Sequence, residues 1–241
     1  MSDQRNVVMA VHTALTSEPR LDIRKNPIAI AYDGEALTLE GEAPSVAAKK
    51  LALEQAAAVP EVTGIVDRLH VKPAQRMGDG EIRDLMRNAL LQEPALSECA
   101  IYEIVKGERE TVRETPASIR GAIELEVRDG IITLNGAVGG LDEKRLAGVL
   151  AWWIPGTRDV VNGLAVEPDE EDSFDLIAEA VRLTLEKDAW VDASQLRVGV
   201  RGRTVTLGGI LPSDAQRDMA ERDAWYIFGV DKVVNNIEVG R

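Results

Sequence analysis

Three apolar residues at helical spacing open the chain, and the same stripe occurs twice more. Each stripe has apolar residues at positions i, i+4 and i+8, which lie on one face of an α-helix. Six residues after each stripe comes another apolar residue, at Leu21, Leu96 and Val191. The pattern predicts an amphipathic helix at the start of three segments, with buried stripes of Val7, Val11 and Leu15, of Ile82, Met86 and Leu90, and of Ile177, Val181 and Leu185.

Apolar and polar residues alternate after each first helix, which indicates a strand with one buried face. The alternation is clearest at Ile123, Leu125 and Val127, and again at Leu196, Val198 and Val200. Glycine tolerates a positive φ, and Asp-Gly pairs favour hairpins. We therefore expect each strand to turn back into a second strand, through tight turns at Asp33-Gly34, Asp129-Gly130 and Arg201-Gly202.

A second helix and a last strand complete each segment. Ser45 and Ser213 each follow a proline at a position suited to a helix N-cap, and the second copy has Leu141-Asp142 there. The last strand carries a Val-Asx-x-apolar pattern in all three copies. The chain is therefore predicted to be an α+β protein of three tandem α-β-β-α-β modules. Each module is expected to be a three-stranded mixed sheet with two helices packed on one face.

The copies align without a gap over their second halves. From the glycine after a Thr-Leu pair (Gly41, Gly136, Gly209), 28 residues lead to Leu69, Leu164 and Ile237. Alanine recurs 11 and 15 residues after each glycine. Polar, proline-containing segments separate the copies, as linkers do. The predicted modules are residues 3–72, 79–167 and 172–241.

The second module carries an insertion. Leu96 and Asp129 are 33 residues apart, whereas the matching distances are 12 from Leu21 to Asp33 and 10 from Val191 to Arg201. The additional residues lie near 101–120 and carry charges of both signs. Loops this long in compact domains are either functional or solvated segments without a function, and both interpretations stay open.

Composition narrows the class of protein. Of 241 residues, 45% are hydrophobic and 29% charged, which is ordinary for a soluble globular protein. The net charge of −13 repels nucleic acid at long range, so we expect no nucleic-acid partner. No run of residues is long and apolar enough for a transmembrane segment, and no signal-peptide pattern follows Met1. With one cysteine, Cys99, no intrachain disulfide can form, and we expect a cytoplasmic protein.

Two sequence strings, together with the order α-β-β-α-β, resemble the BON family, named after bacterial osmotic-stress and nodulation proteins. They are Asp-Gly-Ile-Ile-Thr-Leu-Asn-Gly at 129–136 and Gly-Val-Asp-Lys-Val-Val-Asn-Asn-Ile at 229–237. The resemblance covers nearly the whole chain, three times. The first copy departs from it at Glu35-Ala36, where one residue is added, and at Asp67, where Asn is usual.

This resemblance implies a non-enzymatic module. Family members bind phospholipid surfaces, build envelope assemblies or, in one cytoplasmic case, bind potassium together with a different partner domain. The sequence lacks the signal peptide that most envelope members carry, and it also lacks that partner domain.

Four of the few aromatic residues form two matching pairs at the end of the second helix in modules two and three: Trp152, Trp153, Trp225 and Tyr226. Neighbouring helix positions point about 100° apart, so one ring of each pair is expected in the core and the other at its edge. One interpretation is an apolar contact site for lipid or a partner. The other is packing between modules two and three, which small modules need.

Two further sets of polar residues are candidates. Arg197, Arg201 and Arg203 form a basic cluster in module three, which is either a weak anion site or a set of solvated strand charges in an acidic module. Asp67, Asn162 and Asn235 recur at one strand position, and with the repeated glycines we assign them structural roles, since Asx side chains readily bond local backbone.

No catalytic or metal-binding pattern is present in the sequence. His12 and His70 are neither paired nor repeated, Cys99 has no CxxC partner, and no P-loop or GxGxxG occurs. We therefore expect no enzyme, no cofactor and no metal site. The leading hypothesis is an interaction protein that engages a phospholipid surface or a protein partner, with a role in osmotic or envelope stress implied by the resemblance alone. The alternatives are a soluble receptor for a small ligand or a cation such as potassium, and a self-associating structural protein.

Overall fold

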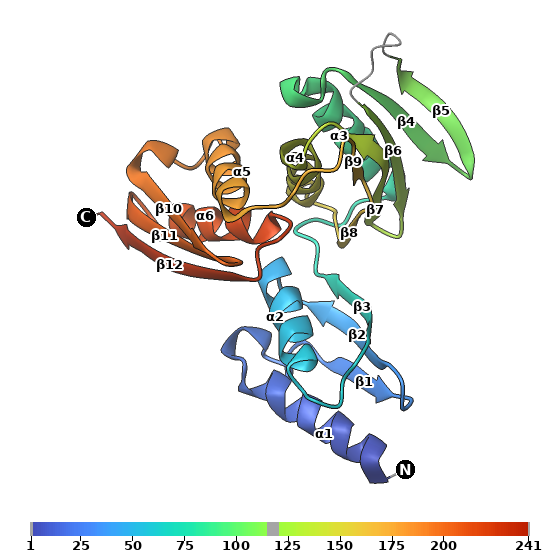
Figure 1. Cartoon of the computed structure of the whole chain (residues 1–241), viewed down its shortest axis with the longest axis vertical. Helices are drawn as coiled ribbons and strands as arrows, with labels where there is room; N and C mark the ends of the chain where they lie inside the picture. Colours follow the sequence, from blue (N-terminus) through green and yellow to red (C-terminus); the bar gives the residue numbers. More distant parts are fainter. Residues whose placement is uncertain (1, 115–120, 241) are drawn as a thin grey trace. The chain divides into compact units, whose positions relative to one another are not determined.

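The computed structural model describes residues 2–114 and 121–240, with side chains from residue 4 onward. Over these residues the protein is α+β, as predicted, with six α-helices and three mixed sheets (Figure 1). The chain divides into two compact units, residues 1–72 and 73–241. The first unit holds the first module, and the second unit holds the other two.

The first module has the predicted order of elements. Its five main elements are α1 (Ser2–Ser17), β1 (Ile28–Tyr32), β2 (Leu37–Ala43), α2 (Val46–Ala57) and β3 (Ile65–Val71). A 3-10 turn, η1 (Pro19–Leu21), follows α1. The sheet runs β1-β2-β3, with β1 antiparallel and β3 parallel to β2. Both helices pack on one face of the sheet (Figure 1).

The third module repeats this topology. It consists of α5 (Phe174–Lys187), η3 (Ala193–Gln195), β10 (Leu196–Arg201), β11 (Thr204–Leu211), α6 (Asp214–Tyr226) and β12 (Lys232–Val239). Its sheet runs β10-β11-β12, with β10 antiparallel and β12 parallel to β11. Leu196, Val198 and Val200 face the helices, and the residues between them in β10 are exposed on the open face.

The second module keeps this frame and adds to it. The shared elements are α3 (Asp79–Gln92), η2 (Pro94–Leu96), β6 (Gly121–Arg128), β7 (Ile131–Val138), α4 (Leu141–Trp153), β8 (Asp159–Asn162) and β9 (Ala165–Val166). Two further strands, β4 (Cys99–Val105) and β5 (Glu108–Arg113), precede β6. The order is β5-β4-β6-β7-β8, and β9 also pairs with β7.

The expectation of three strands is therefore wrong for this module, whose sheet has six. The described part of the insertion is a hairpin that turns at Lys106-Gly107, and β4 lies parallel to β6. Residues 115–120 of the predicted insertion lie outside the described part of the chain. Period-two alternation missed β4 because its first residues, Cys99-Ala100-Ile101, are all apolar and all buried.

The apolar positions of the repeat form the module cores, which confirms the predicted helix faces. All nine members of the three helical stripes are at most 5% exposed. The repeated alanines are fully buried in the second helices, at Ala52, Ala147 and Ala220 and at Ala56, Ala151 and Ala224. Small side chains at these positions let each second helix lie close to its sheet.

The second helices start as predicted in two modules. Ser45 Oγ accepts from Ala48 N at 3.2 Å, and Ser213 Oγ accepts from Gln216 N at 3.3 Å. In the second module Gly140 is the N-cap and supplies no side chain. There the backbone N–H of Leu141 donates to Glu170 Oε2 at 2.8 Å, so a residue of the following linker satisfies the helix end.

The repeated glycine is required by a close approach of two backbones. Gly41, Gly136 and Gly209 have φ values of 153°, 110° and 130°, and each pairs with the first strand of its hairpin. A Cβ at Gly41 would lie 2.7 Å from Pro27 O, and the other two glycines face the equivalent carbonyl even more closely. Any other residue would be strained and would push the two strands apart.

We therefore expect Gly209→Ala to destabilise the third module by about 2 kcal/mol or more, from backbone strain together with the steric clash. Gly208→Ala is the matched control, because a Cβ there has no heavy atom within 4 Å. It should change stability by no more than about 0.5 kcal/mol. Urea unfolding followed by far-UV circular dichroism would measure both, and equal effects would contradict the assignment.

Candidate functional site

The recurrent Asx position on the last strand bonds to local backbone in all three modules. Its side-chain Oδ1 accepts from the backbone N–H two residues later, at 2.9 Å for Asp67, 3.4 Å for Asn162 and 3.1 Å for Asn235. The amide nitrogens of the two asparagines also donate to a carbonyl of the second helix, at Lys144 and Arg217. These contacts suit the structural role proposed for this position.

In the first module an ion pair replaces the bond from the asparagine amide to the helix carbonyl. Asp67 cannot donate, and its Oδ2 lies 3.0 Å from Nζ of Lys49, whose side chain is buried. Lys49 stands in α2 where the other copies have Lys144 and Arg217. The departure of Asp67 from the usual Asn is therefore matched by a buried ammonium group on the helix.

The predicted aromatic group lies between the second and third modules. The rings of Trp152 and Tyr226 are stacked, with centroids 6.0 Å apart and planes 14° from parallel. Trp153 Nε1 donates to Asp223 Oδ1 at 2.9 Å. Trp225 is only 2% exposed, and the other three rings are half-buried. The group therefore joins α4 to α6.

Two ion pairs add to this junction. Arg145 in α4 is 1% exposed, and its guanidinium donates to Phe228 O at 3.1 Å and to Asp172 Oδ1 at 2.6 Å. Lys187, at the end of α5, lies 3.0 Å from both carboxylate oxygens of the buried Glu93. The repeat analysis missed Arg145 because the equivalent positions hold Lys50 and Asp218, so nothing in the repeat marks it.

Asp223 is the most perturbed group at the junction. It is 3% exposed, and its Oδ2 has no hydrogen-bond donor among the described residues. Burial raises the pKa of Asp223 to about 7, the bond from Trp153 opposes the rise, and the carboxyl of Asp188 adds to it. When Asp223 is protonated, its carboxyl group can donate a hydrogen bond to the carboxylate of Asp188.

The basic cluster of module three is spread over two places. Arg197 and Arg201 are exposed on the open face of β10. Arg203 lies in the following turn, 3.7 Å from Asp231 Oδ2. Its charge is thus partly balanced, and the two strand arginines remain as the candidates for an anion.

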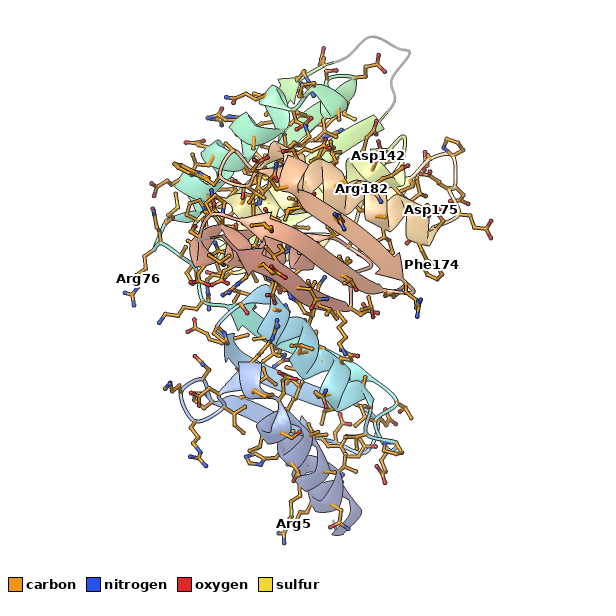
Figure 2. All side chains as sticks on the ribbon, turned by 90° about the vertical axis from the view of Figure 1, so that its left-hand side faces the viewer. Arg5, Arg76, Asp142, Phe174, Asp175 and Arg182 are labelled. Atoms are coloured by element: carbon orange, nitrogen blue, oxygen red, sulfur yellow. The ribbon has the colours of Figure 1, made fainter. Side chains whose placement is uncertain are left out.

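Three aromatic side chains that the sequence analysis did not single out are strongly exposed in module three. Phe174, at the start of α5, is 57% exposed, Trp190 is 71% exposed and Phe228 is 50% exposed (Figure 2 labels Phe174). Lys144 Nζ lies 5.1 Å from the ring centroid of Phe228. The repeat comparison could not find them because none has an aromatic counterpart in both other copies.

The remaining candidates do not form a reactive group. His12 is exposed, His70 is half-buried and Cys99 is buried in β4. Within residues 2–114 and 121–240, no three His, Cys, Asp or Glu residues are grouped so that they could hold a metal ion. None of the helices described is long and apolar enough to cross a membrane.

The fold and the repeated pattern define a class of small α+β modules arranged in tandem. The sequence profile of the BON domain matches residues 3–73, 111–168 and 174–241, so the chain belongs to the BON domain family. This confirms the resemblance in all three copies. The second match begins inside the hairpin insertion and leaves out α3, although α3 stands where α1 and α5 stand in the other modules.

Other comparisons add little. No curated protein matches the sequence. Two solved structures of CdsD, a structural protein of the type III secretion system of Chlamydia trachomatis, align with 13% identity each. The C-terminal-domain structure covers 99% of this chain and 100% of its own, with a TM-score of 0.26. The second covers 98% and 92%, with a TM-score of 0.25. Similarity this low says nothing about the function of this chain.

The buried carboxyl group predicts a pH-dependent junction. Because the folded pKa of Asp223 lies above its ordinary value of 3.8, the folded state binds more protons than the unfolded state between about pH 4 and pH 7. The contribution of Asp223 to stability is therefore fully present below pH 4 and is lost as the pH rises towards 7. The loss is at most about 1.4 kcal/mol per pH unit.

Asp223→Asn removes this titration and should flatten the fall in stability over that range relative to the wild type. Urea unfolding at several pH values, followed by tryptophan fluorescence, measures the difference. Asp218→Asn, a change to an exposed carboxyl on the same helix, serves as the control. Parallel pH profiles for wild type and Asp223→Asn would contradict the assignment.

Arg145 should be the main polar contact of the junction. Arg145→Met leaves Phe228 O and Asp172 without their donor, and we expect a loss of about 2 kcal/mol, because the partly exposed Asp172 can rehydrate. Lys144→Met removes only a partly exposed cation–π contact and should cost less than about 1 kcal/mol. Hydrogen exchange of the α4 and α5 amides would show the loosened junction, and unchanged protection in Arg145→Met would argue against this role.

Proposed function

We propose that this chain is a non-catalytic interaction protein that binds a protein partner through its third module. Membership of the BON domain family supports a binding role. The observation that carries the proposal is Trp190, which is 71% exposed in the turn after α5. Its backbone N–H donates to Asp188 Oδ1 at 2.9 Å, and its neighbour Val191 is buried in the module core.

The exposed indole presents apolar surface to water, which is unfavourable, and burial against a partner would remove that cost. Tryptophan is also among the residues that contribute most to binding at protein interfaces. The four paired aromatics are less suited to this role: Trp152 and Tyr226 stack on each other, Trp153 bonds to Asp223, and Trp225 is buried. The partner surface is therefore expected around Trp190 rather than at Trp152, Trp153, Trp225 and Tyr226.

A phospholipid surface is the second candidate, and exposed Phe174 and Phe228 are the observation in its favour. Aromatic side chains favour the interface between water and lipid. The net charge of −13 opposes it for anionic membranes, because the chain would be repelled at long range. A protein partner therefore ranks first.

A photo-crosslinking phenylalanine analogue placed at Trp190 in source cells tests this proposal. We expect crosslinks to one or a few proteins, and none from the same analogue at exposed Glu171 in the linker. Trp190→Ser should leave the unfolding free energy within about 0.5 kcal/mol of wild type, since the side chain is exposed.

Vesicle flotation with zwitterionic and with anionic lipid tests the alternative that the chain binds a phospholipid surface. The wild-type chain is expected to stay out of both vesicle fractions. Flotation that Trp190→Ser abolishes, without protein crosslinks at Trp190, would replace the protein partner by a lipid surface.

A further inference from the structure

A groove of about 310 Å³ runs between α5 and the first strand of the third module. On the helix side it is lined by Arg182, Leu185 and Glu186. On the strand side it is lined by Leu196, Arg197 and Val198 of β10. The lining thus combines apolar side chains with charged residues, and each of the two elements contributes one arginine. Figure 2 shows Arg182 on α5, above the strands of this module.

The strand beside the groove is an edge strand. The sheet order is β10-β11-β12, so β10 pairs with β11 on one side and with no described strand on the other. The outer edge of such a strand presents N–H and C=O groups that can pair with an added strand. Arg182 Nη2 reaches toward this edge and donates to Val198 O at 3.4 Å, a long contact.

The same edge is occupied in the second module. Strand β6 corresponds to β10, since Ile123 and Leu196 both pair with the repeated glycine of their hairpins. Beside β6 lies β4, parallel to it, with Ile101 opposite Ile123 and fully buried. The frame of this repeat therefore accepts a fourth strand at this edge, and in the second module the insertion supplies it.

The helix arginine is repeated along with the edge. Arg87 and Arg182 occupy the same place in the repeat, five residues after Ile82 and Ile177. Arg87 Nη1 donates to Glu103 Oε1 at 3.3 Å, and Glu103 is a 5% exposed residue of the added strand β4. Glu103 in turn stands opposite Leu125, the counterpart of Val198. Arg182 is thus the counterpart of Arg87, which binds an acidic side chain of the added strand β4.

One difference between the modules indicates what the third would select. On the open face of β6, Glu124 pairs with Arg109 of β5 at 3.0 Å. The third module has Arg197 at the position of Glu124, so the charge at this position is reversed. Glu186 also lines the groove, and Arg182 together with Arg197 on the open face leaves the charged residues around this edge net positive. An added strand with acidic residues fits this groove better than a copy of β4 would.

We infer that this groove binds an extended, acidic segment of a partner protein, which joins the sheet as a strand parallel to β10. An apolar side chain lies opposite Leu196 and fills the groove. An acidic residue opposite Val198 bonds to Arg182, and another on the open face meets Arg197. The segment thus carries an apolar residue followed by two acidic residues. Main-chain pairing would give affinity and the side chains would give specificity.

This inference rests on the proposed binding of a protein partner and names the chemistry of that partner. Trp190, which carries that proposal, is close to the groove in sequence, because it precedes by three residues Ala193, which lines the groove. The exposed Trp190 thus lies in the segment that leads from α5 into the open edge strand β10.

A labelled peptide tests the groove on the full chain. The probe has the sequence of Glu98–Val105 with Cys99→Ser and Tyr102→Glu, which provides the apolar-acidic-acidic pattern in the register of β4. Fluorescence anisotropy should show saturable binding to the wild-type protein. Arg182→Glu should weaken binding by about ten-fold or more, because an attraction at the groove becomes a repulsion. Arg197→Glu should also weaken it.

Two controls separate strand addition from other binding. Arg217→Glu makes the same charge change in α6 and should leave the affinity unchanged. A peptide N-methylated at alternate residues along the edge that faces β10 keeps its side chains but cannot form the ladder, so it should not bind. Thermal unfolding of Arg182→Glu close to that of wild type shows that the module remains folded.

Three binding results would overturn the inference: no binding at millimolar peptide, equal binding by Arg182→Glu, or equal binding by the N-methylated peptide. A fourth outcome would also overturn it: the chain self-associates, Arg182→Glu abolishes the self-association, and the peptide does not bind. In the last case a second copy of this chain would be the occupant. Protein crosslinks at Trp190 without peptide binding would reject the groove alone, whereas peptide binding without such crosslinks would reject the role of Trp190.

Discussion

Each module has to bury one face of a small sheet beneath two helices, and most of its sequence pattern serves that requirement. The helical stripes and the buried alanines form the contact between helices and sheet. The repeated glycine lets the two strands of each hairpin approach closely. A chain of this size buries only about 60% of its surface on folding, so a single module is marginally stable. The second and third modules gain additional buried contacts by packing α4 against α5 and α6. The first module forms a compact unit of its own.

Patterns that repeat were predictable from the sequence, and contacts that occur once were not. The three apolar stripes, the N-caps at Ser45 and Ser213, and the α+β class follow from local periodicity and from threefold comparison. Arg145 was not found, because its neighbours in the repeat differ and its partner Asp172 lies in a linker. The perturbed Asp223 was hidden for the same reason, since its neighbours Trp153 and Asp188 come from other elements.

The insertion shows a different limit of sequence interpretation. A search for alternation finds strands with one buried face, but β4 is covered on both sides at Cys99, Ala100 and Ile101. A charged stretch follows it, and the two together resemble a loop. In the structure β4 extends the sheet at its first strand, so the insertion changes which edge of the module is available for pairing. The same edge in the third module has no added strand among the described residues.

The linker after the second module is fastened at two points: Glu170 accepts from the first turn of α4, and Asp172 binds Arg145. Few residues lie between these attachments, so inserting or deleting a residue there would shift one of them out of reach. Gene rearrangement at this junction would therefore tend to yield a defective pair, and the two modules should be inherited together.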